Sequence, residues 1–214
     1  MEMNHVLQRE HYLNSVLRAF AISLAVAVIG MSIGAFIPPV FFLPLILLEV
    51  GMLVFAFLLR RRKAISFTFL FSFTFISGMT TYPIVAYYAS ISGANVVLMT
   101  FTTTTLVFTG IAIIGWTTKR DLSFLGGMLM AALLALIVIG LFSLFWPLTS
   151  KAMLAYSFIG VLVFSGFVLY DFNRMKHYGV SKEEVPLMAL NLYLDFVNLF
   201  ISLLRFFGIL SSDD

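Results

Sequence analysis

The sequence has no cysteine and few charged residues. Among its 214 residues, 10 are acidic and 13 are basic, so charged residues make up 11%. The absence of cysteine excludes disulfides, thiolate metal sites and cysteine nucleophiles. Soluble domains carry roughly 25% charged residues, whereas this chain is 61% hydrophobic with a mean hydropathy of +1.05. This composition excludes an ordinary soluble domain and indicates an integral membrane protein.

Long polar stretches are also absent, which leaves no room for an attached soluble module. We therefore predict an all-α integral membrane protein, a single domain over residues 1–214. A span needs about 20 mostly apolar residues. Seven segments qualify: 16–37, 40–59, 64–88, 94–116, 122–146, 152–172 and 185–210. We expect no cleaved signal, because the first residues are polar and the apolar stretch after them is long enough to span.

The basic residues between the segments predict the orientation. With the N-terminus in the cytoplasm, one side holds Arg60, Arg61, Arg62, Lys63, Lys119, Arg120, Arg174, Lys176 and Lys182, and the other holds only Lys151. The C-terminus would then lie outside, in the plasma membrane if the source is bacterial. The net charge of +3 follows from this topology, so no nucleic-acid partner is expected.

Two aspartates, Asp171 and Asp195, interrupt the last two apolar segments. A carboxylate at membrane depth costs several kcal/mol unless it is paired or hydrated, so such residues usually face the bundle interior and mark a pathway or a proton site. Two carboxylates close together in a medium of low dielectric constant do not both ionise. We predict that these two lie within hydrogen-bond reach, share one proton near neutral pH, and form the centre of the functional site.

Three other ionisable residues, Glu49, Arg60 and Arg205, lie in or at the ends of the predicted spans. At a rise of about 1.5 Å per residue, Glu49 matches Arg205 in depth, whereas Arg60 matches the two aspartates. We predict an outer pair of Glu49 with Arg205 and an inner group of Arg60 with both aspartates. An alternative is that Arg60 only extends to the interface beside Arg61 and Arg62.

The last segment carries one polar stripe. Asn191, Asp195, Asn198, Ser202 and Arg205 follow spacings of 4, 3, 4 and 3, which place them on one helix face. A helix that faces lipid would not carry such a stripe, so we expect this helix to be central. Hydrogen bonding between helices is the alternative role for Asn198 and Ser202. It does not account for a titratable group at position 195.

Histidines give no metal-ligand spacing: His5 and His11 lie in the polar N-terminal stretch, and His177 is expected in a loop from 173 to 184. No catalytic residues are identified, and no tightly bound cofactor is expected.

The run MALNLYLDFVNLFISLLRFFGIL, with VLYD in the preceding segment, resembles the signature of the Bax-inhibitor family, especially its bacterial YetJ-type members. The resemblance covers essentially the whole chain. It implies a central seventh helix surrounded by the other six, and a proton-sensitive calcium leak channel. It also implies a pH sensor at Asp171 and Asp195, where calcium would bind transiently, and a latch at Arg60. The expected partners are the lipid bilayer, calcium ions and protons, and a monomer is expected.

Two other functions stay open. A proton-coupled calcium exchanger could use the same aspartate pair as a carrier site, and sequence does not separate it from a leak. An intramembrane aspartyl protease would also use two membrane aspartates. However, Asp195 lies in Leu-Tyr-Leu-Asp rather than the Gly-x-Gly-Asp of those proteases, so we do not expect an enzyme.

Overall fold

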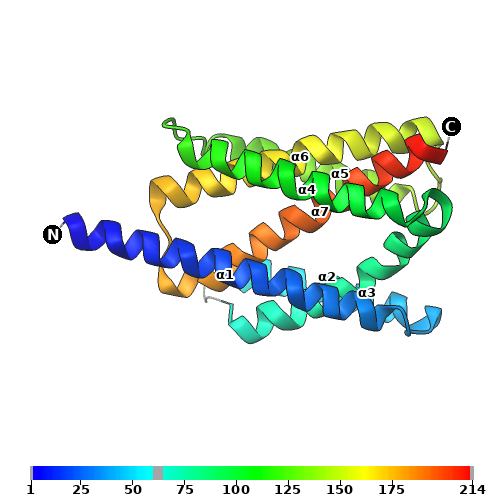
Figure 1. Cartoon of the computed structure of the whole chain (residues 1–214), viewed down its shortest axis with the longest axis horizontal. Helices are drawn as coiled ribbons and strands as arrows, with labels where there is room; N and C mark the ends of the chain where they lie inside the picture. Colours follow the sequence, from blue (N-terminus) through cyan, green and yellow to red (C-terminus); the bar gives the residue numbers. More distant parts are fainter. Residues whose placement is uncertain (1, 60–64, 213–214) are drawn as a thin grey trace. The chain divides into compact units, whose positions relative to one another are not determined.

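The computed structural model describes residues 2–59 and 65–212, and in these ranges all regular elements are helices (Figure 1). The helices are long because the apolar runs that form them contain few breaks. They are α1 (Glu2–Gly34), η1 (Pro39–Phe41), α2 (Phe42–Leu59), α3 (Phe67–Ser92), α4 (Ala94–Thr117), α5 (Leu125–Phe142), α6 (Ser150–Tyr178), η2 (Lys182–Glu184) and α7 (Val185–Ser212).

Seven of the described helices are long and apolar enough to cross a membrane, which confirms the predicted fold class. Their bounds follow the predicted segments closely, with two differences. First, α1 begins well before its apolar span, which covers Tyr12–Gly34. Second, α6 continues to Tyr178, so the loop predicted from residue 173 begins later and His177 lies in the last helical turn. That loop prediction was wrong because a polar sequence was taken for a helix end.

The chain divides into two compact units. Unit 1 comprises Met1–Ile84 and Gly179–Tyr193, and unit 2 comprises Val85–Tyr178 and Leu194–Asp214. Both α3 and α7 contribute residues to each unit. Among the seven spans, α7 has the largest buried share, 67% of its most apolar window against 39% or less for the others. This burial agrees with a helix whose surroundings are protein rather than lipid.

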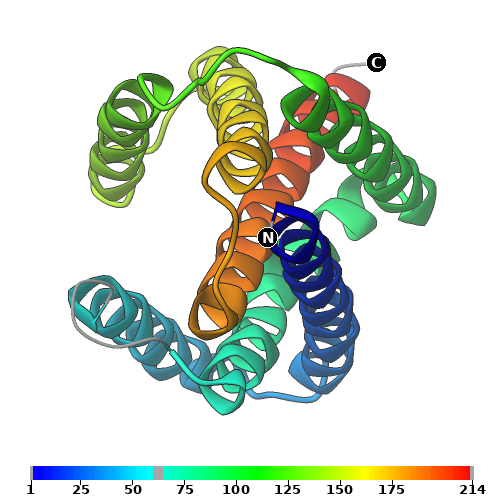
Figure 2. The same cartoon turned by 90° about the vertical axis from the view of Figure 1, so that its left-hand side faces the viewer.

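In unit 1, α3 lies between α1 and α2 (Figure 2). Glycines allow α1 and α3 to approach closely: a Cβ atom at Gly30 would lie 2.1 Å from the Phe75 carbonyl oxygen, and one at Gly78 would lie 2.1 Å from the Ala27 carbonyl oxygen. On its other side, α3 contacts α2 through the rings of Phe69 and Phe55. The α1–α3 contact is therefore backbone against backbone, as small residues permit in membrane helices.

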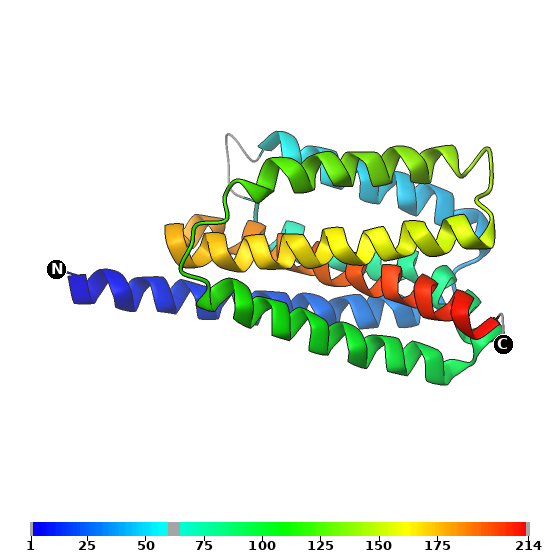
Figure 3. The ribbon, with the colours of Figure 1, turned by 90° about the horizontal axis from the view of Figure 1, so that it is seen from above.

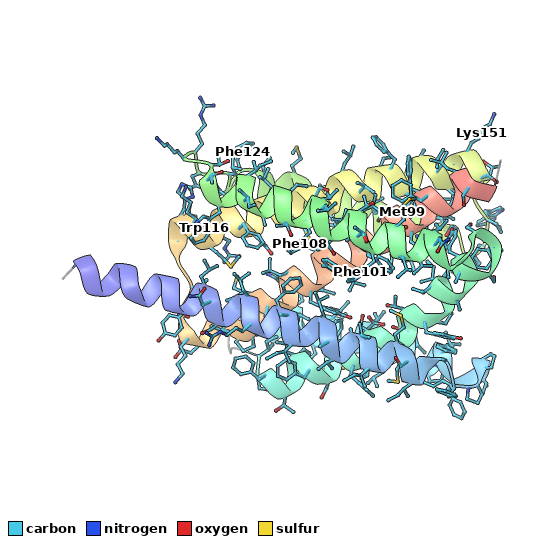
Figure 4. All side chains as sticks on the ribbon, viewed as in Figure 1. Met99, Phe101, Phe108, Trp116, Phe124 and Lys151 are labelled. Atoms are coloured by element: carbon cyan, nitrogen blue, oxygen red, sulfur yellow. The ribbon has the colours of Figure 1, made fainter. Side chains whose placement is uncertain are left out.

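In unit 2, α6 lies between α4 and α5 (Figure 3) and packs on both. Its other neighbour is the C-terminal half of α7, where Gly160 of α6 contacts Ser202. Trp116 and Phe124 lie at one end of this unit and Lys151 at the opposite end (Figure 4). Both aspartates belong to this unit, so the candidate site is described within it.

Candidate functional site

Asp171 on α6 and Asp195 on α7 both belong to unit 2 and are buried, with exposed fractions of 5% and 6%. They lie close enough for the charge of one to act on the other. The Oδ2 atom of Asp195 is buried and has no hydrogen-bond partner among the described residues. A hydrogen bond between the two carboxyl groups stays a prediction.

Aromatic residues that follow the two aspartates in sequence contact rings of α4. Phe172 follows Asp171, and its ring contacts Phe108 of α4 with centroids 6.0 Å apart. Phe196 follows Asp195 and contacts the same Phe108 ring at 5.5 Å. Phe101, also on α4, contacts Phe196 with ring centroids 5.9 Å apart. A carboxylate that is buried to this extent loses hydration, so a charge here requires a proton, a cation or another compensating group.

Asn173 fixes the helical turn that carries Asp171. It is 1% exposed, and its Nδ2 donates to the carbonyl oxygens of Gly115 at 3.3 Å and Arg120 at 3.0 Å. Its Oδ1 accepts from the backbone N–H of Leu122 at 2.9 Å. A side chain at Gly115 would be 2.7 Å from the Leu169 carbonyl oxygen, so α4 lies directly against α6 here. The sequence analysis missed this residue because it placed position 173 in a loop.

Further hydrogen bonds join the end of α6 to the segment between α4 and α5. Lys176 Nζ donates to the Thr118 carbonyl oxygen at 3.0 Å. The two ring nitrogens of His177 lie 3.0 Å from the Asn173 carbonyl oxygen and 3.1 Å from that of Lys119. Three successive carbonyl groups of the segment thus contact side chains of α6, which holds the segment in one conformation.

Asp121 completes this connection. Its carboxylate accepts hydrogen bonds from the hydroxyl and the backbone N–H of Ser123 and, at 2.6 Å, from the Tyr178 hydroxyl. These bonds, that of the Ser123 hydroxyl foremost, lower the pKa of Asp121 to about 2. Asp121 therefore keeps its negative charge at neutral and mildly acidic pH.

Removing the Asn173 amide should destabilise unit 2. We expect Asn173→Leu to lower the unfolding free energy by about 2–5 kcal/mol, because one buried and two partly buried backbone groups lose their partners. Thermal unfolding in detergent measures this. Lys176→Met is the matched control, since it removes one partly exposed bond to the same segment and should cost far less. Equal losses in the two variants would contradict the central role of Asn173.

None of the five residues of the polar stripe is exposed. Asn198 Nδ2 donates to the Leu194 carbonyl oxygen and Ser202 Oγ to the Asn198 carbonyl oxygen, both at 2.7 Å. These bonds lie within α7, so they satisfy the two polar groups locally rather than joining helices. Asn191 belongs to unit 1 and is half-buried.

Glu49 and Arg205 each have a polar or aromatic neighbour in their own unit. Glu49 of α2 accepts a hydrogen bond from the Thr80 hydroxyl in unit 1. The guanidinium of Arg205 lies over the ring of Tyr156 in unit 2, 6.0 Å from its centroid, a distance typical of a weak cation–π contact. Because the two residues belong to different units, their pairing stays a prediction.

The Glu49–Arg205 pairing predicts non-additive losses. Glu49→Gln and Arg205→Gln should each cost roughly 3–5 kcal/mol, because each leaves a lone charge at membrane depth, and the double variant should cost less than their sum. The yield of folded protein in detergent and its thermal unfolding measure the three variants. Additive losses would show that the two residues act independently.

Two other predicted features are not tested by the structure. Arg60, the predicted latch, lies outside the described residues. Within the described ranges, no group of three or more His, Cys, Asp and Glu side chains forms a metal cluster. Transient calcium at Asp171 and Asp195, which would involve two carboxylates only, stays a prediction.

Comparisons with known proteins cover nearly the whole chain. Residues 9–212 match the family model described as inhibitor of apoptosis-promoting Bax1. The chain is 35% identical to the inner membrane protein YbhL of Escherichia coli over 79% of this chain and 75% of that protein. It is 35% identical to Bax inhibitor 1 of Schizosaccharomyces pombe, over 70% of this chain and 54% of that protein. A Golgi anti-apoptotic protein of vaccinia virus is 38% identical, over 72% of this chain and 62% of its own length.

The family match extends through the helices that carry both aspartates and agrees with the seven apolar helices. The chain is therefore a multi-pass membrane protein that belongs to the Bax-inhibitor family.

Proposed function

We propose that the protein is a pH-sensitive calcium leak channel in which Asp171 and Asp195 respond to protons. The observation that carries this proposal is a pair of buried, interacting carboxyl groups at membrane depth, one of them with an oxygen that lacks a hydrogen bond among the described residues. Carboxylate oxygens are the ligands that calcium prefers. The membership in the Bax-inhibitor family and the resemblance to its calcium-leak members support the choice of ion.

The pair can change its charge without a large movement. In apolar surroundings, one shared proton leaves a single negative charge, and a second proton removes that charge. A negative pair attracts calcium and any basic residue near it, whereas a neutral pair attracts neither. Protonation therefore has two opposite effects on calcium flux. It weakens the attraction of calcium, which lowers the flux, and it weakens any contact that keeps the path closed, which raises the flux.

Arg60 is the proposed latch. The depth that the sequence predicts for Arg60, at the end of the second span, matches the depth predicted for the two aspartates. While the pair is negative, attraction to the guanidinium would hold the inner ends of three spans together. The second proton would release them and open the path. We expect the latch effect to exceed the loss of attraction, because a latch sets the population of open channels.

Arg60→Ala should leak more calcium than wild type at neutral pH and should gain little on acidification. Calcium flux into liposomes that contain the purified variant measures both quantities. Arg61→Ala is the matched control and should behave as wild type. A folded Arg60→Ala protein that is no leakier than wild type at neutral pH would refute the latch.

The proposed function is tested by calcium flux in liposomes with and without a proton gradient. A leak moves calcium only down its own gradient, whichever direction protons are driven. Calcium movement against its gradient, driven by protons, would instead show the proton-coupled exchanger. If no calcium flux is seen with or without the proton gradient, both functions are contradicted and the protease alternative is reopened.

A further inference from the structure

The segment between α4 and α5 joins two membrane spans through residues 118–124 only, so it lies at the membrane surface. Its two basic side chains, Lys119 and Arg120, are exposed. Their backbone carbonyl groups contact His177 and Asn173, but their charged ends have no hydrogen bond or ion pair with the described part of the chain. Two positive charges are thus displayed at a fixed place, with no protein partner of their own in the described ranges.

The neighbouring charges reinforce this positive field. Arg174 and Lys176, two basic residues at the end of α6, are both half-buried, and Lys176 contacts the same segment. The acidic residue of the segment, Asp121, is engaged by Ser123 and Tyr178. Basic residues therefore outnumber acidic ones, and the hydrogen bonds of Asp121 direct its carboxylate toward protein groups. A basic cluster beside a membrane attracts anionic lipid headgroups.

Two aromatic residues lie close in sequence to the basic side chains, Trp116 near the end of α4 and Phe124 just before α5. Phe124 is 72% exposed, and Trp116 is half-buried at the end of α4 (Figure 4). Trp at a helix end is typical of the level of lipid headgroups, and an exposed Phe beside it suits acyl chains. The arrangement offers positive charge for a phosphate and apolar surface for the chain attached to it.

The segment is also held in one conformation, which separates it from a basic loop that serves topology alone. Side chains at the end of α6 form hydrogen bonds with the backbone of Thr118, Lys119, Arg120 and Leu122. The positive-inside rule requires charge but no fixed conformation. A fixed conformation reduces the entropy lost when a ligand binds.

We propose that Lys119 and Arg120 bind the phosphodiester headgroup of an anionic phospholipid, with Phe124 and Trp116 against its acyl chains. This inference does not depend on calcium transport. It predicts that the purified protein retains phosphatidylglycerol in preference to phosphatidylcholine. The retained lipid would bind at the end of unit 2 that carries the 118–124 segment.

The test is lipid retention from nanodiscs that contain equal amounts of phosphatidylglycerol and phosphatidylcholine, read by native mass spectrometry after transfer to detergent. At about 1 kcal/mol for each basic residue near a membrane surface, Lys119→Gln and Arg120→Gln should each reduce the preference about fivefold, and the double variant roughly 25-fold. Lys151→Gln is the matched control at the opposite end of unit 2 and should leave the preference unchanged (Figure 4).

The charge-conserving double exchange, Lys119→Arg with Arg120→Lys, keeps the net charge and should keep the preference, which separates lipid binding from misfolding or altered insertion. Three results would overturn the proposal. The first is a wild-type protein that shows no preference for phosphatidylglycerol. The second is a Lys151→Gln variant that loses as much of this preference as Lys119→Gln or Arg120→Gln. The third is a folded double Gln variant that still prefers phosphatidylglycerol as wild type does.

Discussion

Replacing both Asp171 and Asp195 with Asn should abolish the pH dependence of calcium flux. Both side chains are buried and act on each other, so their protonation is expected to be the charge change that acid produces at membrane depth. Asparagine keeps the size and the polarity of aspartate but does not titrate. We expect flux through the double variant to be the same at mildly alkaline and mildly acidic pH, whereas wild-type flux rises with acidity.

Two control variants test whether a different titratable group produces the pH response. Asp121→Asn should keep the wild-type response, because the pKa of Asp121 is lowered to about 2 and its charge does not change over the range used. Since the folded-state pKa is lowered, any stability that the Asp121 charge contributes is lost only as pH falls toward that value. His177→Gln tests the histidine on α6. If the double Asn variant responds to pH as wild type does, the sensor lies elsewhere.

Adding a methyl group at Gly30 or Gly78 should sharply destabilise unit 1. At each position the new Cβ would lie 2.1 Å from a carbonyl oxygen of the facing helix, and backbone atoms do not yield as a flexible side chain can. Helices α1 and α3 would have to separate, which loses packing along their contact. We expect Gly30→Ala and Gly78→Ala each to cost about 1–3 kcal/mol or more.

Gly51→Ala is the matched control for those variants. Gly51 is also helical and in unit 1, but nothing lies within 4 Å of the position where its Cβ would be. Alanine is favoured over glycine in a helix by up to about 1 kcal/mol, so this variant should be neutral or slightly stabilising. Apparent melting temperatures in one detergent compare the three. A similar effect in all three would show that the close α1–α3 contact does not determine stability.

The spans could be predicted well because a membrane requires about 20 consecutive apolar residues, and composition alone reveals such runs. A buried α7 could also be predicted from a single periodic feature, the stripe from Asn191 to Arg205. The burial of that helix confirms the reasoning, since none of the stripe residues is exposed.

The connection at the end of α6 could not be predicted in the same way. Asn173, Lys176 and His177 are polar residues after an apolar run, which is the usual sign that a membrane helix has ended. Their side chains pair with groups more than fifty residues earlier, at Gly115 and in the 118–124 segment. Such pairing leaves no periodic pattern in one sequence. The close contact at Gly115 could not be predicted either, because a glycine within a helix can have many roles.

The central claim, that Asp171 and Asp195 take up the proton, is tested most directly by infrared difference spectroscopy of the purified protein in lipid. Acidification from mildly alkaline to mildly acidic pH should produce a carboxylic acid C=O band in wild type. We predict that this band is absent from the Asp171→Asn, Asp195→Asn double variant and present in Asp121→Asn. A band of unchanged size in the double variant, or no band in wild type, would contradict the claim.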